Sequence, residues 1–204
     1  MSSDEKKIRM NPIQEEEERK VAELLDKKKM MSTITVYGVK GEKFNNWRTV
    51  GNLYAVAKLY SLREVDELIF LDVNATDEGR SVSTESIQYF SETLDVPFTV
   101  GGGIDSLQKA SECIQSGAEK ILIGTAAVSD PQLIKKLADT FGSQAVVVSI
   151  DISKELASMM THCGKRTVEL NPIDFAIQMQ KMGAGELLIQ SIDRDGTLNG
   201  LCLE

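Results

Sequence analysis

The sequence lacks several features that would assign it to a common class of protein. Only three of its 204 residues are cysteines, Cys113, Cys163 and Cys202, and they lie far apart. An odd number of cysteines without a CxxC spacing argues against both a disulfide framework and a zinc site. The single histidine, His162, lies beside Cys163, and two adjacent residues do not form a metal site. We therefore expect neither a metal nor another cofactor.

Long apolar runs and an excess of positive charge are also absent. No apolar run approaches the ~20 residues of a membrane span, and no signal peptide is visible, so we expect a cytoplasmic protein without a membrane partner. The net charge of −8 argues against nucleic acid as the main partner, although it leaves a local anion site possible. The composition, 42% hydrophobic and 26% charged, is typical of a globular domain.

The chain divides into an N-terminal extension at residues 1–31 and one domain at residues 32–204. The extension carries charge blocks at Glu15–Glu18 and Lys27–Lys29, which predict a solvated helix or a disordered segment. The β-branched segment Thr33–Val39 predicts a strand. A polar loop at 41–51 follows, and its Trp47 could belong to a binding lid or could anchor the loop.

From residue 53 onward, short apolar segments alternate with amphipathic ones. Strands are expected to begin near residues 67, 97, 120, 145 and 186, with helices at about 53–60, 83–94, 106–117, 131–141 and 171–182. Residues 152–168 form either a hairpin or a long loop. This alternation predicts an α/β fold with a parallel sheet. Because no GxGxxG follows the first strand, we favour a (β/α)8 barrel of TIM type, incomplete and with about six βα units, over an open sheet.

Polar residues follow nearly every predicted strand, and in a barrel these positions share one rim. Gly101–Gly103 and Thr125 follow adjacent strands and suit an oxyanion held by backbone N–H groups and a hydroxyl, although the glycines could simply form a tight turn. Asp151 and Asp195 are candidates for general acid–base chemistry. We assign the remaining loop acids, Asp77 and Asp105, to helix capping.

Six motifs in order resemble the cyclase subunit of imidazole glycerol phosphate synthase, a (β/α)8 barrel of histidine biosynthesis. They are DELIFLDV, PFTVGGGI, TAAV, FGSQAVVVSID, GAGELL and SIDRDGT, and the similarity runs from about Lys40 to Leu203. The resemblance implies a lyase that uses ammonia from a glutaminase subunit. Its substrate is a phosphoribulosyl formimino carboxamide ribotide, and its products are imidazole glycerol phosphate and an aminoimidazole carboxamide ribotide.

The resemblance also implies roles for individual residues. Asp151 matches one of two catalytic aspartates. Substrate or phosphate binding is implied for Lys40, Asp72, Gly102, Gly103, Thr125, Asp195 and Gly196. At the opposite face of the barrel, Glu67, Lys120 and Glu186 match charged residues that ring an ammonia entrance.

Departures from the family pattern limit what is expected of this chain. Ser32 stands where the other catalytic aspartate belongs, Gly124 replaces a usual asparagine, and the sequence stops after the sixth strand. We therefore expect an incomplete barrel with weak or no cyclase activity by itself. Two alternatives remain: the homologous ammonia-supplying barrel partner of an amidotransferase in surface-polysaccharide sugar synthesis, and a non-catalytic truncated barrel.

Overall fold

The computed structural model describes residues 33–36, 39–49, 57, 60, 63, 65–154 and 158–198. The predicted extension at residues 1–31 lies outside the described residues, as do Ser32 and most of the helix predicted at 53–60.

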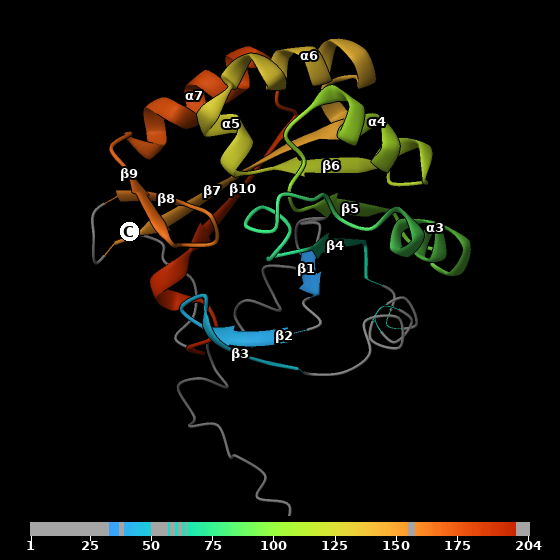
Figure 1. The fold of residues 1–204 in the computed structure, drawn as a ribbon, viewed down its shortest axis with the longest axis horizontal. Coiled ribbons are helices and arrows are strands. Elements are labelled where there is room, and N and C mark those ends of the chain that lie inside the picture. The colour runs from blue at the N-terminus through green and yellow to red at the C-terminus, as the bar shows by residue number, and fades with distance from the viewer. Residues whose placement is uncertain are drawn as a thin grey trace, which may run out of the picture. The chain divides into compact units, whose positions relative to one another are not determined.

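The main sheet has eight strands, and all of its pairings are parallel except those of β7 with β8 and of β8 with β9 (Figure 1). The parallel strands lie in the order of the sequence: β1 (Thr33–Val36), β4 (Glu67–Leu71), β5 (Phe98–Gly101), β6 (Lys120–Ile123), β7 (Val146–Ser153) and β10 (Glu186–Ser191). A doubly wound sheet reverses this order at a switch point, whereas a barrel keeps it. The predicted barrel-type α/β fold is therefore confirmed, although the strands described here do not close a barrel.

Residues that alternate along the strands build two separate apolar clusters. Leu68 and Phe70 of β4 face the helices, where the ring of Phe70 stacks on that of Phe90 at a centroid distance of 3.9 Å. Ile69 points the other way and packs with Leu122 and Val147, residues that would face the inside of a barrel. This alternation also places Glu67, two residues before Ile69, in the inward set.

Four longer helices cover one face of the sheet, and each begins at a residue whose side chain caps it (Figure 1). They are α3 (Thr84–Thr93), α4 (Leu107–Gln115), α6 (Pro131–Phe141) and α7 (Pro172–Met182), with the caps Ser83, Ser106, Asp130 and Asn171. The caps predicted at Asp77 and Asp105 are wrong, because neighbouring serines satisfy the first N–H groups instead. Among the helices that the structure describes, none combines the length and hydrophobicity that a membrane crossing requires.

The predicted polar loop at 41–51 is instead an antiparallel hairpin of β2 (Val39–Glu42) and β3 (Asn45–Thr49). Its two turn residues, Lys43 and Phe44, have φ values of 50° and 56°, as a type I′ turn requires. The sequence carries no Asn-Gly or Asp-Gly at this point, so the usual hairpin signal is missing. The predicted strand Thr33–Val39 accordingly ends at Val36, and Val39 belongs to the hairpin.

A second excursion, β8 (Ser158–Thr161) and β9 (Arg166–Val168), confirms the hairpin alternative for residues 152–168. β10 occupies one edge of β7 along Val147–Ile152. The other edge pairs first with β6, at Val146–Val148, and then with β8, at Asp151–Ser153. The β8–β9 hairpin therefore stands directly beyond the C-terminal end of β6, where the short helix α5 (Thr125–Ser129) begins.

Candidate functional site

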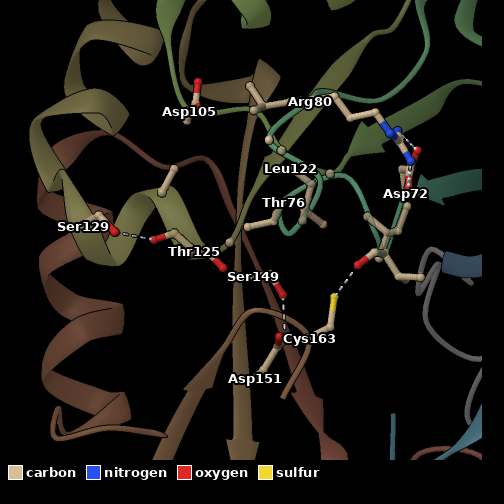
Figure 2. Close-up of a pocket in the computed structure, with 18 of the residues that line it drawn as sticks. Asp72, Thr76, Arg80, Asp105, Leu122, Thr125, Ser129, Ser149, Asp151 and Cys163 are labelled. Atoms are coloured by element: carbon tan, nitrogen blue, oxygen red, sulfur yellow. Dashed lines mark hydrogen bonds and ion pairs between the residues drawn. The ribbon is translucent and has the colours of Figure 1, made fainter. Parts of the chain in front are cut away.

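A cavity of about 300 Å³ opens at the C-terminal ends of the parallel strands. Five of the predicted site residues line it: Asp72, Gly102, Gly103, Thr125 and Asp151 (Figure 2). They come from four different strand ends, which the serial strand order brings to one edge of the sheet. In barrel proteins this edge is where the loops build the active site.

Gly102 and Gly103 form the floor of the cavity in conformations that favour glycine, with φ values of 120° and 62°. A Cβ on Gly103 would lie 1.8 Å from the carbonyl oxygen of Arg80, and one on Gly102 would lie 2.5 Å from that of Asp72. The glycines therefore allow the β5 loop to pack against the β4 loop. This packing explains the glycines without a ligand, so phosphate binding here remains a prediction.

Asp151 projects into the cavity from β7, with Ser149 on the same face of the strand (Figure 2). Burial raises the pKa of Asp151 to about 6, against the opposing effect of the hydrogen bond from Ser149. Ser149 Oγ donates to Oδ1 of Asp151 at 2.8 Å, which leaves Oδ2 for another partner. A carboxyl group with this pKa can take up or release a proton near neutral pH.

Asp72 is held by Arg80, a cavity residue that the sequence did not single out. The guanidinium forms an ion pair with the Asp72 carboxylate and also binds Glu78, and both contacts raise the pKa of Arg80. Asp72 Oδ1 also accepts a hydrogen bond from the amide of Asn74 at 3.2 Å. Only the fold of the loop after β4 brings Arg80 back to Asp72, so the sequence offered no local signal for this pair.

Cys163 is a second cavity residue that was not predicted. Its Sγ donates to the carbonyl oxygen of Val73 at 3.0 Å, and burial raises the pKa of its thiol to about 11. Within the described residues, no group of three or more potential metal ligands lies together. His162 contributes a backbone contact instead, since its amide donates to Thr125 Oγ1 at 3.0 Å.

Two predicted substrate-binding residues, Asp195 and Gly196, are not among the described residues that line the cavity, and Lys40 is described by its backbone pairing alone. Lys40 pairs with Arg48 in the β2–β3 hairpin. Asp195 follows the short 3₁₀ helix η2 (Ile192–Arg194), and its carbonyl oxygen accepts from the amide of Lys43 at 2.9 Å. Gly196 comes next, with φ at 68°. Their roles in binding remain predictions.

Loop acids outside the predicted site form ion pairs. Asp77 pairs with Lys165, and this contact lowers the pKa of Asp77. Asp105 pairs with Lys109 at 2.9 Å. These pairs account for the two carboxylates that were expected to cap helices.

At the N-terminal ends of the strands, the predicted entrance residues form one cluster. Lys120 Nζ lies 3.0 Å from Glu67 Oε2 and 2.7 Å from Glu186 Oε1. Thr99 Oγ1 donates to the other oxygen of Glu67 at 2.7 Å. Burial lowers the pKa of Lys120, but the hydrogen bonds with Glu186 and Glu67 outweigh it and give a net rise. The three predicted charged residues are therefore in direct contact.

An apolar layer separates this cluster from the cavity. It consists of Ile69, Leu122 and Val147, with Leu71 and Leu188 packed against them. These residues belong to β4, β6, β7 and β10, and all four strands also supply cluster or cavity residues. The inward face of the sheet thus passes from charged to apolar to polar along the strand direction.

Serial parallel strands with a cavity at their C-terminal ends define the class: a (β/α) barrel-type protein with its site where such proteins hold their active sites. The chain belongs to the family described as histidine biosynthesis protein, whose model matches residues 30–204.

Curated relatives of the chain are named imidazole glycerol phosphate synthase subunit HisF. The protein from Thermotoga sp. (strain RQ2) is 46% identical over 164 residues, which cover 79% of this chain and 65% of the relative. The protein from Chlorobium chlorochromatii (strain CaD3) is 44% identical over the same coverage. A third, from Chloroherpeton thalassium (strain ATCC 35110 / GB-78), is 44% identical over 165 residues. The matched part thus spans about two thirds of the length of these relatives.

Proposed function

We propose that the chain acts as the cyclase component of imidazole glycerol phosphate synthase, the activity for which its relatives are named. Its substrate would be the phosphorylated ribotide and its nitrogen donor ammonia. The observation that carries the proposal is the buried carboxyl of Asp151, with a pKa of about 6, in the same cavity as the glycine loop and Thr125.

Asp151 would serve as the acid–base group. Its Oδ1 is engaged by Ser149, so Oδ2 is the atom that would take or give a proton. A pKa near the working pH makes both protonation states accessible, which is what proton transfer in a ring-forming reaction needs. Burial is what raises the pKa of Asp151, because the charged form of the carboxyl is poorly solvated.

A phosphate of the ribotide would bind between the Gly102–Gly103 loop and Thr125. Backbone N–H groups at a glycine loop and a threonine hydroxyl are both donors to an oxyanion. The pair of Asp72 and Arg80 borders the same space and would orient the sugar hydroxyls or the phosphate.

A glutaminase subunit would bind at the opposite end, over Glu67, Lys120 and Glu186. The support for this proposal is the order of the inward residues, in which a charged cluster is followed by an apolar layer and then by the cavity. Ammonia is small and neutral, so it crosses an apolar layer far more easily than an ammonium ion does.

The test is turnover of the ribotide by the purified chain with an ammonium salt as the nitrogen source. Asp151→Asn should reduce turnover by about 10²–10⁴-fold, the usual contribution of a general acid–base group. Asp139→Asn, on the exposed face of α6, is the control and should leave turnover unchanged. Binding of the ribotide without any turnover would instead identify a non-catalytic barrel.

The ammonia route is tested separately, by adding a glutaminase subunit and glutamine. Glu186→Gln should lower glutamine-dependent turnover and leave turnover with ammonium salt unchanged, because the substitution removes a charge far from the cavity. Equal losses in both assays would argue against an entrance at this cluster.

A further inference from the structure

The turn between β8 and β9, residues 162–165 and called here the β8–β9 turn, lies over the C-terminal edge of the sheet. Because β8 pairs with β7 beyond the end of β6, the turn lies next to the first residue of α5. The amide of His162 donates to Thr125 Oγ1 at 3.0 Å. A hairpin that follows β7 in the chain and pairs with it thus contacts a hydroxyl just after the end of β6.

Two further contacts tie the same turn to the loop after β4. Cys163 Sγ donates to the carbonyl oxygen of Val73 at 3.0 Å, next to Asp72. Lys165 forms an ion pair with Asp77 in the same loop. The β8–β9 turn therefore bridges the loops of β4 and β6, which are separated in the sheet by β5.

The backbone of the turn takes a conformation that residues other than glycine rarely adopt. His162 and Cys163 have φ values of 53° and 52°, and both lie in the left-handed region. Consecutive non-glycine residues remain there only where surrounding contacts fix them. Here the backbone hydrogen bond from the Lys165 amide to the Thr161 carbonyl closes the turn, and the His162 amide and the Cys163 thiol each make a further contact outside the hairpin.

The contact with His162 determines where the Thr125 hydroxyl can donate. In the described part of the chain, the only hydrogen-bond partner of Thr125 Oγ1 is the His162 amide, which uses one of its lone pairs. The hydroxyl hydrogen must point away from an N–H group, and Thr125 lines the cavity. The hydroxyl is therefore available as a donor to an acceptor in the cavity.

We propose that the β8–β9 turn is a positioning element that aims the Thr125 hydroxyl at the oxyanion of a phosphate ester in the cavity. The anchors at Cys163 and Lys165 keep the His162 amide in place, so the turn acts on the ligand through Thr125. This inference rests on the proposed phosphate site but not on the cyclase reaction.

The test is a double-mutant cycle on the binding of ribose 5-phosphate, measured by isothermal titration calorimetry. One variant removes the hydroxyl, Thr125→Val. The other releases the turn by combining Cys163→Ala with Lys165→Met, and the third carries all three substitutions. We expect Thr125→Val to weaken binding by about 10-fold or more, since it removes a hydrogen bond to a charged group. The released turn should weaken it about five-fold, as a misdirected donor loses part of that hydrogen bond.

Coupling is the decisive result. If the turn acts through Thr125, the triple variant binds as Thr125→Val does, because releasing the turn has no effect once the hydroxyl is gone. If the effects multiply, or the released turn binds as the wild type does, the proposal is overturned. Cys163→Ser retains a donor to Val73 and should bind more tightly than Cys163→Ala. If the released-turn variant does not fold, Cys163→Ala takes its place in the double-mutant cycle, and Cys163→Ser serves as its control.

Two controls separate the possible failures. Lys135→Met breaks an ion pair on the exposed face of α6 and should leave the affinity unchanged. A wild-type chain that does not bind ribose 5-phosphate overturns the phosphate site and this inference with it. A chain that binds the ester and shows the coupling, yet has no cyclase turnover, supports the positioning role and contradicts the proposed reaction alone.

Discussion

Lys120 Nζ lies 3.0 Å from Glu67 Oε2 across the intervening strand β5, and Glu67 is only 2% exposed. Removing the ammonium would leave a buried carboxylate whose one remaining hydrogen bond within the described part of the chain comes from Thr99. We expect Lys120→Met to lower the free energy of unfolding by about 3 kcal/mol, the loss typical of breaking a buried ion pair. Urea denaturation measures this loss directly.

The matched control is Lys135→Met, which also removes a lysine from a carboxylate contact, but on an exposed helix face. Its expected loss is below about 0.5 kcal/mol, because solvent screens an exposed pair. Similar losses for the two variants would mean that Glu67 is as well solvated as a surface carboxylate.

Asp151 should make stability depend on pH in an unusual direction for an aspartate. Its pKa is raised from 3.8 to about 6 by burial, so the folded protein binds the proton more tightly than the unfolded chain does. The resulting stabilisation is fully present below pH 3.8 and is lost as the pH rises through 6.

Asp151→Asn removes this dependence. Relative to the wild type, its free energy of unfolding should rise by up to about 3 kcal/mol between pH 4 and pH 7, from the size of the pKa shift. Comparing the two proteins at each pH cancels the titration of all other groups. A difference that stays constant across this range would show that the Asp151 pKa is not raised.

Gly79 and Gly103 have nearly the same φ, 66° and 62°, but very different surroundings. A Cβ on Gly79 would have nothing within 4 Å, whereas one on Gly103 would collide with the Arg80 carbonyl. Gly79→Ala should therefore cost only the conformational term, about 1 kcal/mol. Gly103→Ala should cost about 3 kcal/mol or more, because the β4 loop must move as well.

Chemical denaturation of these two variants checks the packing of the cavity floor. Equal losses would indicate that the β4 and β5 loops can separate at little cost. In that case the close approach of the Gly103 backbone to the Arg80 carbonyl would not explain why position 103 is a glycine.

The two thiols in the described part of the chain should both be slow to react. Burial raises the pKa of Cys113 and of Cys163 to about 11 in each case, so few molecules carry a thiolate at neutral pH. In a Cys202→Ala background, we expect the rate of iodoacetamide labelling at Cys163 to rise about tenfold per pH unit up to about pH 10.

Cys163→Ser in the same background leaves Cys113, which is 1% exposed. This variant should resist labelling when folded and react fully in urea. A labelling rate at Cys163 that levels off near pH 9 would contradict the raised pKa.

The repeating part of the fold was predictable because its signals are local. Val146–Val148 is apolar on both faces and becomes a strand covered on both sides, and Asn171 followed by Pro172 marks the start of α7. Asp151 directly follows the apolar segment from which β7 was predicted, and this position placed it at the rim, where it lines the cavity.

The parts that were missed depend on contacts distant in sequence. The turn at Lys43 and Phe44 lacks glycine and is supported by packing of Phe44 against Met160 and Ile192. Arg80 and Cys163 enter the site only through the paths of their loops. Side-chain type alone cannot predict such placements, because arginine and cysteine in a loop have many possible partners.

The serial order of the parallel strands also bears on how the chain folds. Each strand from β4 to β10 pairs with the next parallel strand along the chain, so every pairing closes a single βα loop. Loop closure of this kind carries a smaller entropic cost than bringing distant segments together, and it keeps the contact order low for a parallel sheet. Folding can therefore proceed by adding one βα unit at a time to a growing edge. The β8–β9 hairpin lies within the last of these closures, between β7 and β10, which is therefore the one closure that includes a hairpin as well as a helix.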